Sequence, residues 1–127
     1  MDKLTFESLV CEKYSVEAEH PFDDDLTTTV FRHGDNRKWF AIVMRIPRIK
    51  LGLSGEGRID VVNFKCSPEL IYSLWEESGI FPAYHMNKNH WITVCLDGSV
   101  PDETIDWLLR ISFGLTAAKK RIKRVKV

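Results

Sequence analysis

One segment limits the possible folds of this chain more than any other: a run of almost continuous apolar residues from Trp39 to Ile46, ended by Pro47. Its aromatic and β-branched residues favour a β-strand. Such a run is typical of a strand that is buried on both faces or placed centrally in a sheet. Its uninterrupted part, Trp39 to Met44, spans about six residues, well short of the ~20 that a membrane-spanning helix needs. The sequence therefore predicts a buried or central strand here.

The flanking sequence carries further strand and helix patterns. Asp2 can cap a first helix. Ser67-Pro68-Glu69 begins a second, because a hydroxyl, a proline at the first helical position and an early acid favour helix starts. Gly79 is expected to end the second helix, and Pro101 marks the start of a third. We expect strands at 27–31, 39–46 and 59–66, and a hairpin of 84–86 with 90–96.

The resulting element order is α-β-β-β-α-β-β-α, without regular alternation of strand and helix. Gly34-Asp35-Asn36 supplies the turn of the first hairpin, and Asn87-Lys88-Asn89 lies at the turn of the second. This order predicts an α+β fold, a mainly antiparallel sheet with helices packed on one face. We assign residues 1–118 to this single domain and residues 119–127 to a basic C-terminal tail.

The composition agrees with a single globular domain. Of the 127 residues, 44% are hydrophobic and 28% are charged. No basic and apolar leader follows Met1. Cys11, Cys66 and Cys95 are widely spaced, so we expect three reduced structural thiols. We therefore expect a soluble, cytoplasmic protein that is monomeric and does not associate with membranes.

The charges are balanced overall but polarised along the chain. The 18 bases equal the 18 acids, so the net charge gives no indication of a polyanionic partner. Residues 1–29 nevertheless carry eight acids and two bases, whereas residues 119–126 contain six bases. These six are Lys119, Lys120, Arg121, Lys123, Arg124 and Lys126.

No motif specifies catalysis or a cofactor. The three glycines of residues 52–57 differ in spacing from the nucleotide-binding motifs and precede a strand, which indicates a mobile connection. His85 and His90 flank a turn but lack a third metal ligand. Asp23-Asp24-Asp25 lacks the spacing of a calcium loop. No nucleophile-and-base arrangement stands out, so we expect a non-enzymatic protein without a cofactor. Metal binding on the acidic edge is a weaker alternative.

Basic and amide side chains at both turns favour a nucleic-acid partner. A two-stranded ribbon can enter a groove and place its turn residues on phosphates and bases. Tyr84 and Trp91, beside the second turn, could stack on bases if they are exposed. The candidate contacts are Arg32, His33, Arg37 and Lys38 at the first turn, Asn87, Lys88, Asn89 and His90 at the second, and Lys119, Lys120, Arg121, Lys123 and Arg124 in the tail.

Several segments of the chain resemble the MmcQ/YjbR family. Residues 82–94, PAYHMNKNHWITV, followed by LDGSVPD at 96–102, are similar to its signature. His20-Pro21-Phe22, KCSPEL at 65–70 and LTAAK at 115–119 add further matches. The resemblance covers about residues 20–119 and implies a small bacterial α+β domain of the CyaY-like (frataxin-like) type.

The same resemblance implies a function. The family is generally described as DNA-binding, and its two hairpins are likened to a double wing, here 33–38 and 87–90. No activity or catalytic residue comes with the resemblance. The leading hypothesis is therefore a non-enzymatic DNA-binding domain that uses both turns and the basic tail. The alternative is a protein- or small-ligand-binding domain that uses the groove between sheet and helices, and a weak dependence of binding on salt would favour it.

Overall fold

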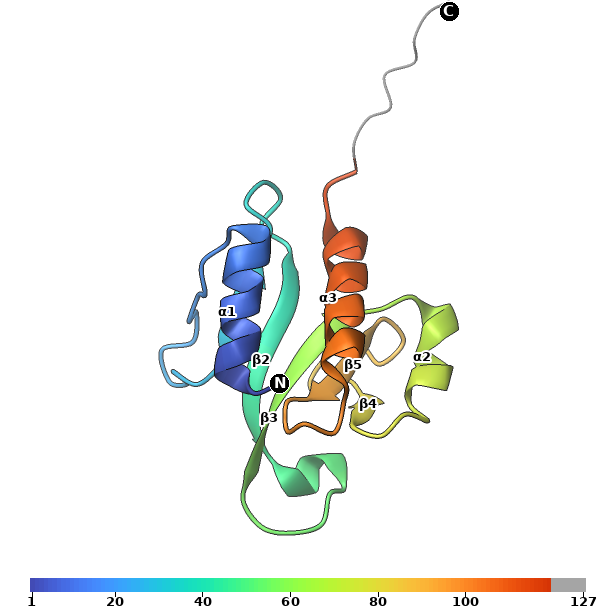
Figure 1. Ribbon diagram of the computed structural model, residues 1–127. Coiled ribbons are helices and arrows are strands. Elements are labelled where there is room, and N and C mark those ends of the chain that lie inside the picture. Colours follow the sequence, from blue (N-terminus) through green and yellow to red (C-terminus); the bar gives the residue numbers. More distant parts are fainter. Residues whose placement is uncertain (120–127) are drawn as a thin grey trace, which may run out of the picture.

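The computed structural model describes residues 1–119, which form three helices and a five-stranded antiparallel sheet (Figure 1). The strand order is β1-β2-β3-β5-β4. The predicted α+β class is confirmed. The elements are α1 (Lys3–Tyr14), β1 (Thr29–Arg32), β2 (Trp39–Pro47), the 3₁₀ helix η1 (Arg48–Leu51), β3 (Arg58–Lys65), α2 (Pro68–Leu74), β4 (Ile80–Pro82), β5 (Trp91–Cys95) and α3 (Asp102–Thr116).

The apolar run that begins at Trp39 becomes β2, which pairs with β1 on one side and β3 on the other. An interior strand with both edges paired and most side chains buried needs apolar residues on both faces. The sequence-based prediction of a buried strand is therefore confirmed.

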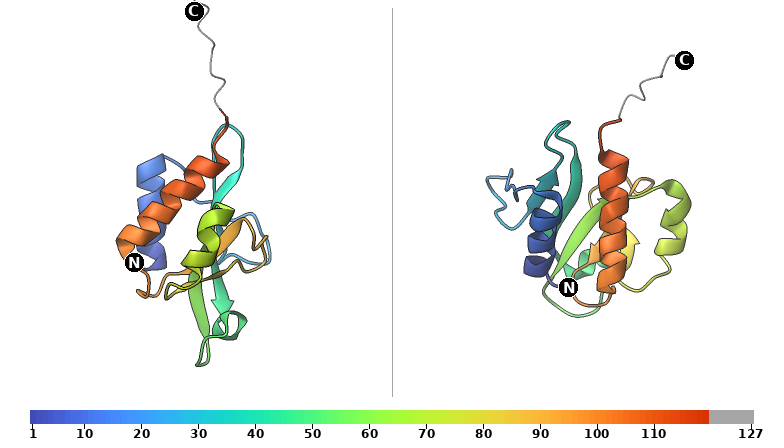
Figure 2. Two further views of the ribbon diagram at one scale, coloured as in Figure 1. Left: turned by 90° about the vertical axis from the view of Figure 1, so that its right-hand side faces the viewer. Right: turned by 45° about the horizontal axis from the view of Figure 1, so that its top comes forward.

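Helices α1 and α3 cover one face of the sheet, as the two views in Figure 2 show. Phe6 and Val10 of α1 and Leu108 and Leu109 of α3 are fully buried or nearly so. Phe6 meets Phe64 of β3 edge to face, with ring centroids 5.8 Å apart. Helix α2 adds further apolar side chains to the same core at the β4 edge. One apolar core between the sheet and the helices thus holds the domain together.

A β-bulge in β2 decides which of its side chains reach that core. Phe31 pairs with Ala41 but Arg32 pairs with Trp39, so Phe40 is an extra residue on β2. Phe40 and Ala41 both belong to the core cluster. Trp39 lies on the other side of the bulge and lines the opposite face of the sheet, together with Ile42 and Met44. Without the bulge, strand alternation would put Trp39 on the core face with Ala41 and Val43; with it, Phe40 faces the core and Trp39 the opposite side.

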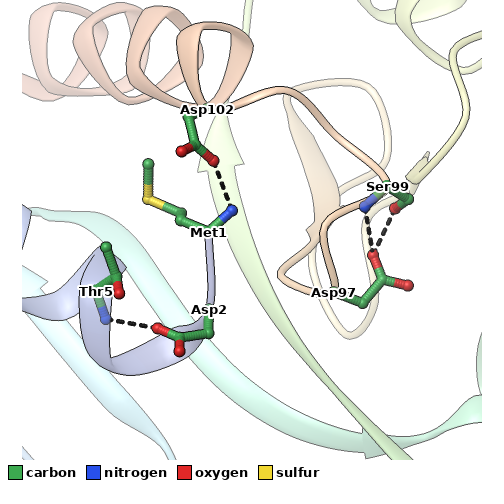
Figure 3. Close-up of polar contacts among 6 residues, drawn as sticks. All are labelled: Met1, Asp2, Thr5, Asp97, Ser99 and Asp102. Carbon is green, nitrogen blue, oxygen red and sulfur yellow. Dashed lines mark hydrogen bonds and ion pairs between the residues drawn. The ribbon is translucent and has the colours of Figure 1, made fainter.

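Helix α1 is capped at its N-terminal end and joined by an ion pair to the N-terminal end of α3 (Figure 3). The Thr5 backbone N–H donates to Asp2 Oδ1 at 2.8 Å, which lowers the pKa of Asp2. The predicted cap of the first helix is thus confirmed. The Met1 amino group lies 2.6 Å from Oδ1 of Asp102, the first residue of α3, so an ion pair joins the starts of α1 and α3.

The second helix is shorter than predicted. Helix α2 ends at Leu74, and the Ser67 side chain makes no capping hydrogen bond, although Pro68 occupies the first turn as expected. Gly79 does not cap this helix but leads into β4 with φ +84°. The predicted helix end was therefore wrong, because a glycine with positive φ is equally suited to the turn before a strand.

Gly79 is required by packing as well as by its backbone angle. A Cβ at this position would lie within van der Waals overlap of Ser99 Oγ and 2.7 Å from Val100 Cγ2. Ser99 is itself held by Asp97, whose Oδ1 accepts hydrogen bonds from the Ser99 N–H at 3.0 Å and hydroxyl at 2.5 Å (Figure 3). Burial alone would raise the pKa of Asp97, but these hydrogen bonds outweigh it and lower the pKa.

The second hairpin also differs from the prediction. Its first strand is β4, residues 80–82, and not residues 84–86, since Ile80 pairs with Val94 and Pro82 with Ile92. Residues 83–90 form the connecting loop, in which His85 adopts φ +58°. A left-handed residue cannot continue a strand, which explains why the aromatic and β-like pattern at 84–86 gives a loop.

Candidate functional site

The sheet register brings both predicted turns to the same end of the molecule. Arg32 pairs with Trp39 at the end of β1, and Lys65 of β3 pairs with Trp91 at the start of β5. Because Ile42 of β2 faces Asn63 of β3, all these positions lie at one end of the sheet. Adjacent strands are about 4.8 Å apart, so β2 and β5, on either side of β3, are separated by roughly 10 Å.

At the first turn, two of the four predicted residues are free to meet a partner. Arg37 and Lys38 are exposed. Arg37 Nη2 lies 3.3 Å from Glu19 Oε1, an ion pair at the surface. Arg32 is half-buried, with its guanidinium 5.4 Å from the centre of the Trp39 ring and its Nε 3.4 Å from the other Glu19 oxygen. Arg32 thus already contacts Trp39 and Glu19 on the open face of the sheet, which is the face opposite α1 and α3.

His33 is a core residue and not a surface contact. Its side chain is only 5% exposed, between Phe40 and Phe113, at ring-centroid distances of 5.2 and 4.3 Å. The Thr116 hydroxyl donates to the Ser112 carbonyl, so it accepts from His33 Nε2 at 2.8 Å. The sequence placed His33 beside a turn but could not show that the end of α3 covers it.

At the second turn, the loop residues bond to the loop itself. Asn87 Oδ1 accepts from the Asn89 N–H at 2.8 Å, and Lys88 Nζ donates to the Ala83 carbonyl at 2.9 Å. Asn87, Lys88, Asn89 and His90 are nevertheless all exposed. The His90 carbonyl accepts from the Cys66 N–H at 2.8 Å, which fixes the end of the loop to the end of β3. This turn is therefore an ordered, exposed projection.

The C-terminal end of α3 lies beside the first turn. Asn36 Nδ2 donates to the Thr116 carbonyl at 2.9 Å, next to the His33–Thr116 contact. Lys119, the last described residue of the candidate set, is exposed. Lys120, Arg121, Lys123 and Arg124 lie outside the described residues.

Carboxylates are distributed so that this end keeps free bases. Residues 1–119 contain 13 bases and 18 acids, a net charge of −5. Within that part of the chain, Lys38, Lys88 and Lys119 form no ion pair, whereas Glu19 is shared by Arg32 and Arg37. Unpaired lysines at this end thus occur in a domain of negative net charge, with the acid Asp35 exposed in the first turn.

A buried polar network on the open face, opposite α1 and α3, was not found from the sequence. The Tyr84 N–H donates to Thr93 Oγ1 at 2.8 Å, the Thr93 hydroxyl donates to Asn63 Oδ1 at 2.5 Å, and Asn63 Nδ2 donates to the Tyr84 carbonyl at 2.9 Å. Asn63 and Thr93 are fully buried. This closed cycle of three hydrogen bonds attaches loop 83–90 to β3 and β5 of the sheet. The sequence signal for it is Asn63, flanked by apolar residues in β3, and Thr93, the one polar residue of β5.

Beside this network lies a cavity of about 430 Å³. The loops 20–28 and 83–90 stand on the open face, as the left view of Figure 2 shows. The cavity lies between them and is lined by Phe22, Asp24, Asp25, Thr28, Trp39, Ile42, Met44, Asn63, Tyr84, His85 and Met86. An apolar core occupies most of the space between the sheet and the helices. A smaller cavity of about 300 Å³ lies on that side, where Leu74, Val100 and Trp107 are among its lining residues, so a ligand-binding groove between sheet and helices stays a prediction.

Asp25 organises one wall of the cavity. Its carboxylate accepts hydrogen bonds from the Thr27 N–H at 3.0 Å, the Thr27 hydroxyl at 2.6 Å and the Thr28 hydroxyl at 2.5 Å. These bonds lower the pKa of Asp25 to about 2, so it is ionised at neutral pH. Asp24 forms no ion pair or hydrogen bond within residues 1–119.

The described residues do not meet the requirements of a metal site, a reactive thiol or a membrane-spanning helix. Within the described residues, no three histidine, cysteine, aspartate or glutamate side chains come together as a possible metal site. Cys66 and Cys95 are buried and unbonded, and burial raises the pKa of both thiols, that of Cys95 to about 11. No helix within residues 1–119 is long and apolar enough to cross a bilayer.

The five-stranded antiparallel sheet, with helices on one face and both turns at one end, is that of a small α+β domain. The model of the YjbR family matches residues 11–115, and the chain belongs to that family, which confirms the resemblance. The uncharacterised protein YyaQ of Bacillus subtilis is 39% identical over 107 residues, 84% of this chain and 91% of YyaQ. The uncharacterised protein YjbR of Escherichia coli K12 is 47% identical over 53 residues, 41% of this chain and 45% of its own.

Solved structures show the same fold. A crystal structure of a Pseudomonas syringae protein matches with a TM-score of 0.90 and 44% identity, covering 92% of this chain and 100% of its own. A crystal structure of a Deinococcus radiodurans protein matches with a TM-score of 0.70 and 30% identity, covering 97% and 84% respectively.

Proposed function

We propose that this chain is a cytoplasmic, non-enzymatic DNA-binding domain that docks through the end of its sheet where both hairpin turns lie. One observation carries the proposal: the register places the turn at 33–38, the turn at 87–90 and the end of α3 at the same end of the molecule. The six bases of residues 119–126 begin three residues after the last residue of α3, Thr116. Three separate basic segments can therefore approach one phosphate backbone.

The contacts proposed for DNA differ between residues. Arg37, Lys38, Lys88 and Lys119 are exposed and would meet phosphates. Arg37 would exchange a surface ion pair, which contributes little stability in water, for a phosphate contact. His33 is left out of the interface because it is buried, and it positions the turn through Thr116.

The acids of the domain set the docking direction. Asp24 and Asp25 line the cavity on the open face, where DNA would be repelled. A domain of this charge would bind DNA weakly and in one orientation.

Fluorescence anisotropy with a labelled random-sequence duplex tests the proposal. We expect binding in the micromolar range at 50 mM salt and a steep loss at 200 mM, since counterions are released from each phosphate contacted. Binding that is equal at both salt concentrations, or absent at both, would contradict the proposal.

A further inference from the structure

The cavity on the open face shares loop 83–90 with the proposed DNA-binding end, but none of the bases proposed to contact DNA lines it, and it has the composition of a ligand site. A volume of about 430 Å³ is within the range of small-molecule pockets. The bulge in β2 turns Trp39 onto this face, and the hydrogen-bond cycle of Asn63, Thr93 and Tyr84 fixes the loop that forms one wall. The walls are thus built into the fold.

Three aromatic residues, Phe22, Trp39 and Tyr84, line the cavity. Phe22 meets Trp39 edge to face, with ring centroids 6.2 Å apart, and Tyr84 lines the same cavity. Trp39 already holds a guanidinium, that of Arg32, 5.4 Å from its ring centre. Aromatic rings attract cations through their quadrupole, most strongly where water is excluded.

The charged groups at the cavity are carboxylates. Asp24 and Asp25 line it, and no lysine or arginine does so within the described residues. Asp25 is ionised and saturated by threonine donors, whereas Asp24 has no partner in residues 1–119 and is free to pair with a ligand. The side-chain amide of Asn63, which lines the cavity, already donates to the Tyr84 carbonyl and accepts from the Thr93 hydroxyl. It therefore does not favour an anionic ligand.

We propose that this cavity binds a small organic cation, an ammonium group carried on an apolar or aromatic body. The aromatic walls and the methionines would contact the body, and the Asp24 carboxylate would pair with the charge. An anionic ligand would meet two carboxylates in a partly enclosed space, which disfavours it.

Titration of the full-length protein with benzyltrimethylammonium, followed by NMR at the Trp39 indole N–H, tests this site. We expect saturable shifts with millimolar or tighter affinity, and binding of benzyl alcohol and of benzoate at least three-fold weaker at the same ionic strength. Absence of saturation by 50 mM, or equal affinity for the three probes, would overturn the proposal.

Matched variants distinguish binding inside the cavity from a general effect of the negative charge of loop 20–28. Asp24→Asn should weaken benzyltrimethylammonium binding about three-fold or more, and Phe22→Ala about two- to five-fold, the range of an exposed cation–π contact. Asp23→Asn removes the neighbouring charge, which does not line the cavity, and should change the affinity less than 1.5-fold. Equal effects of the two Asp variants would overturn the assignment. Since none of these residues is a proposed DNA contact, the DNA-binding proposal stands or falls separately.

Discussion

At the residue scale, Asn63 and Thr93 show how two polar side chains can be structural inside an apolar sheet. Each is fully buried, and together they satisfy the N–H and the carbonyl of Tyr84. A buried polar group that loses its partner keeps its full desolvation cost. Removing one member of this network should therefore lower stability by more than the loss of one average hydrogen bond.

We therefore predict that Thr93→Val lowers the free energy of unfolding by about 1–3 kcal/mol, since it leaves the Tyr84 N–H and Asn63 Oδ1 unpaired. Urea denaturation followed by circular dichroism measures this. Ser8→Ala, at an exposed position of α1, is the control and should change stability by less than about 0.5 kcal/mol. A Thr93→Val effect as small as the control would show that the network adds no stability.

Asp25 gives a prediction about pH. Its folded-state pKa of about 2 is below the ordinary value of 3.8, so its hydrogen bonds stabilise the fold above the ordinary value and are lost as pH falls through the folded value. We expect the urea midpoint to fall between about pH 4 and pH 2. Asp25→Asn should be less stable at pH 6 and show a smaller fall. An unchanged pH dependence in this variant would assign the acid sensitivity to other carboxylates.

Lys88 tests the second turn as a DNA contact. Lys88→Ala should weaken binding to all DNA sequences and reduce the slope of log Kd against log salt by about 0.9, the value of one phosphate contact. Arg58→Ala, at an exposed position at the start of β3 and therefore at the other end of the sheet, is the matched control and should leave the slope unchanged. Equal behaviour of the two variants would remove the second turn from the proposed interface.

At the scale of elements, the sequence was most reliable where local chemistry decides. The cap at Asp2, the proline start of α2, the apolar strand β2 and the start of α3 near Pro101 all follow from propensity and spacing. The ends of elements were less predictable. Gly79 is compatible with a helix end and with a turn before a strand, and only the end of α2 at Leu74 and the pairing of Ile80 with Val94 distinguish them.

Gly79 can be tested against Gly98, which has a similar backbone angle. Both have positive φ, +84° and +88°, but a Cβ at Gly98 meets nothing within 4 Å. Gly98→Ala should cost about 1–2 kcal/mol, the cost of a left-handed alanine. Gly79→Ala should cost about 1–3 kcal/mol more, because Ser99 and Val100 must move. Thermal unfolding of both variants measures this, and equal losses would refute a packing role for Gly79.

At the scale of the whole molecule, the separation of charge is the main determinant of the proposed DNA interaction. Residues 1–119 have a net charge of −5, and the five bases of residues 120–127 bring the chain to zero. A domain with this distribution should bind polyanions only where its bases are concentrated.

We predict that replacing Lys119, Lys120, Arg121, Lys123, Arg124 and Lys126 by glutamine reduces the salt slope of DNA binding by about five, at roughly 0.9 for each contact. Anisotropy titrations between 50 and 200 mM salt measure the slope. Replacing Lys3 and Arg58 by glutamine, both far from the tail in sequence, serves as the control and should have no effect. A tail variant with an unchanged slope would show that the tail does not contact DNA.

The sequence by itself determined the types of element, their order, the α+β class and the family, because these follow from residue spacing, turn chemistry and segments read along the chain. Only the tertiary structure decided what each face of the sheet presents. The extra residue Phe40 in β2 puts Trp39 on the open face, and contacts of distant segments bury His33 under α3 and join Asn63 to Tyr84. Such features depend on strand register and on packing between residues up to 83 positions apart, which local propensity does not specify.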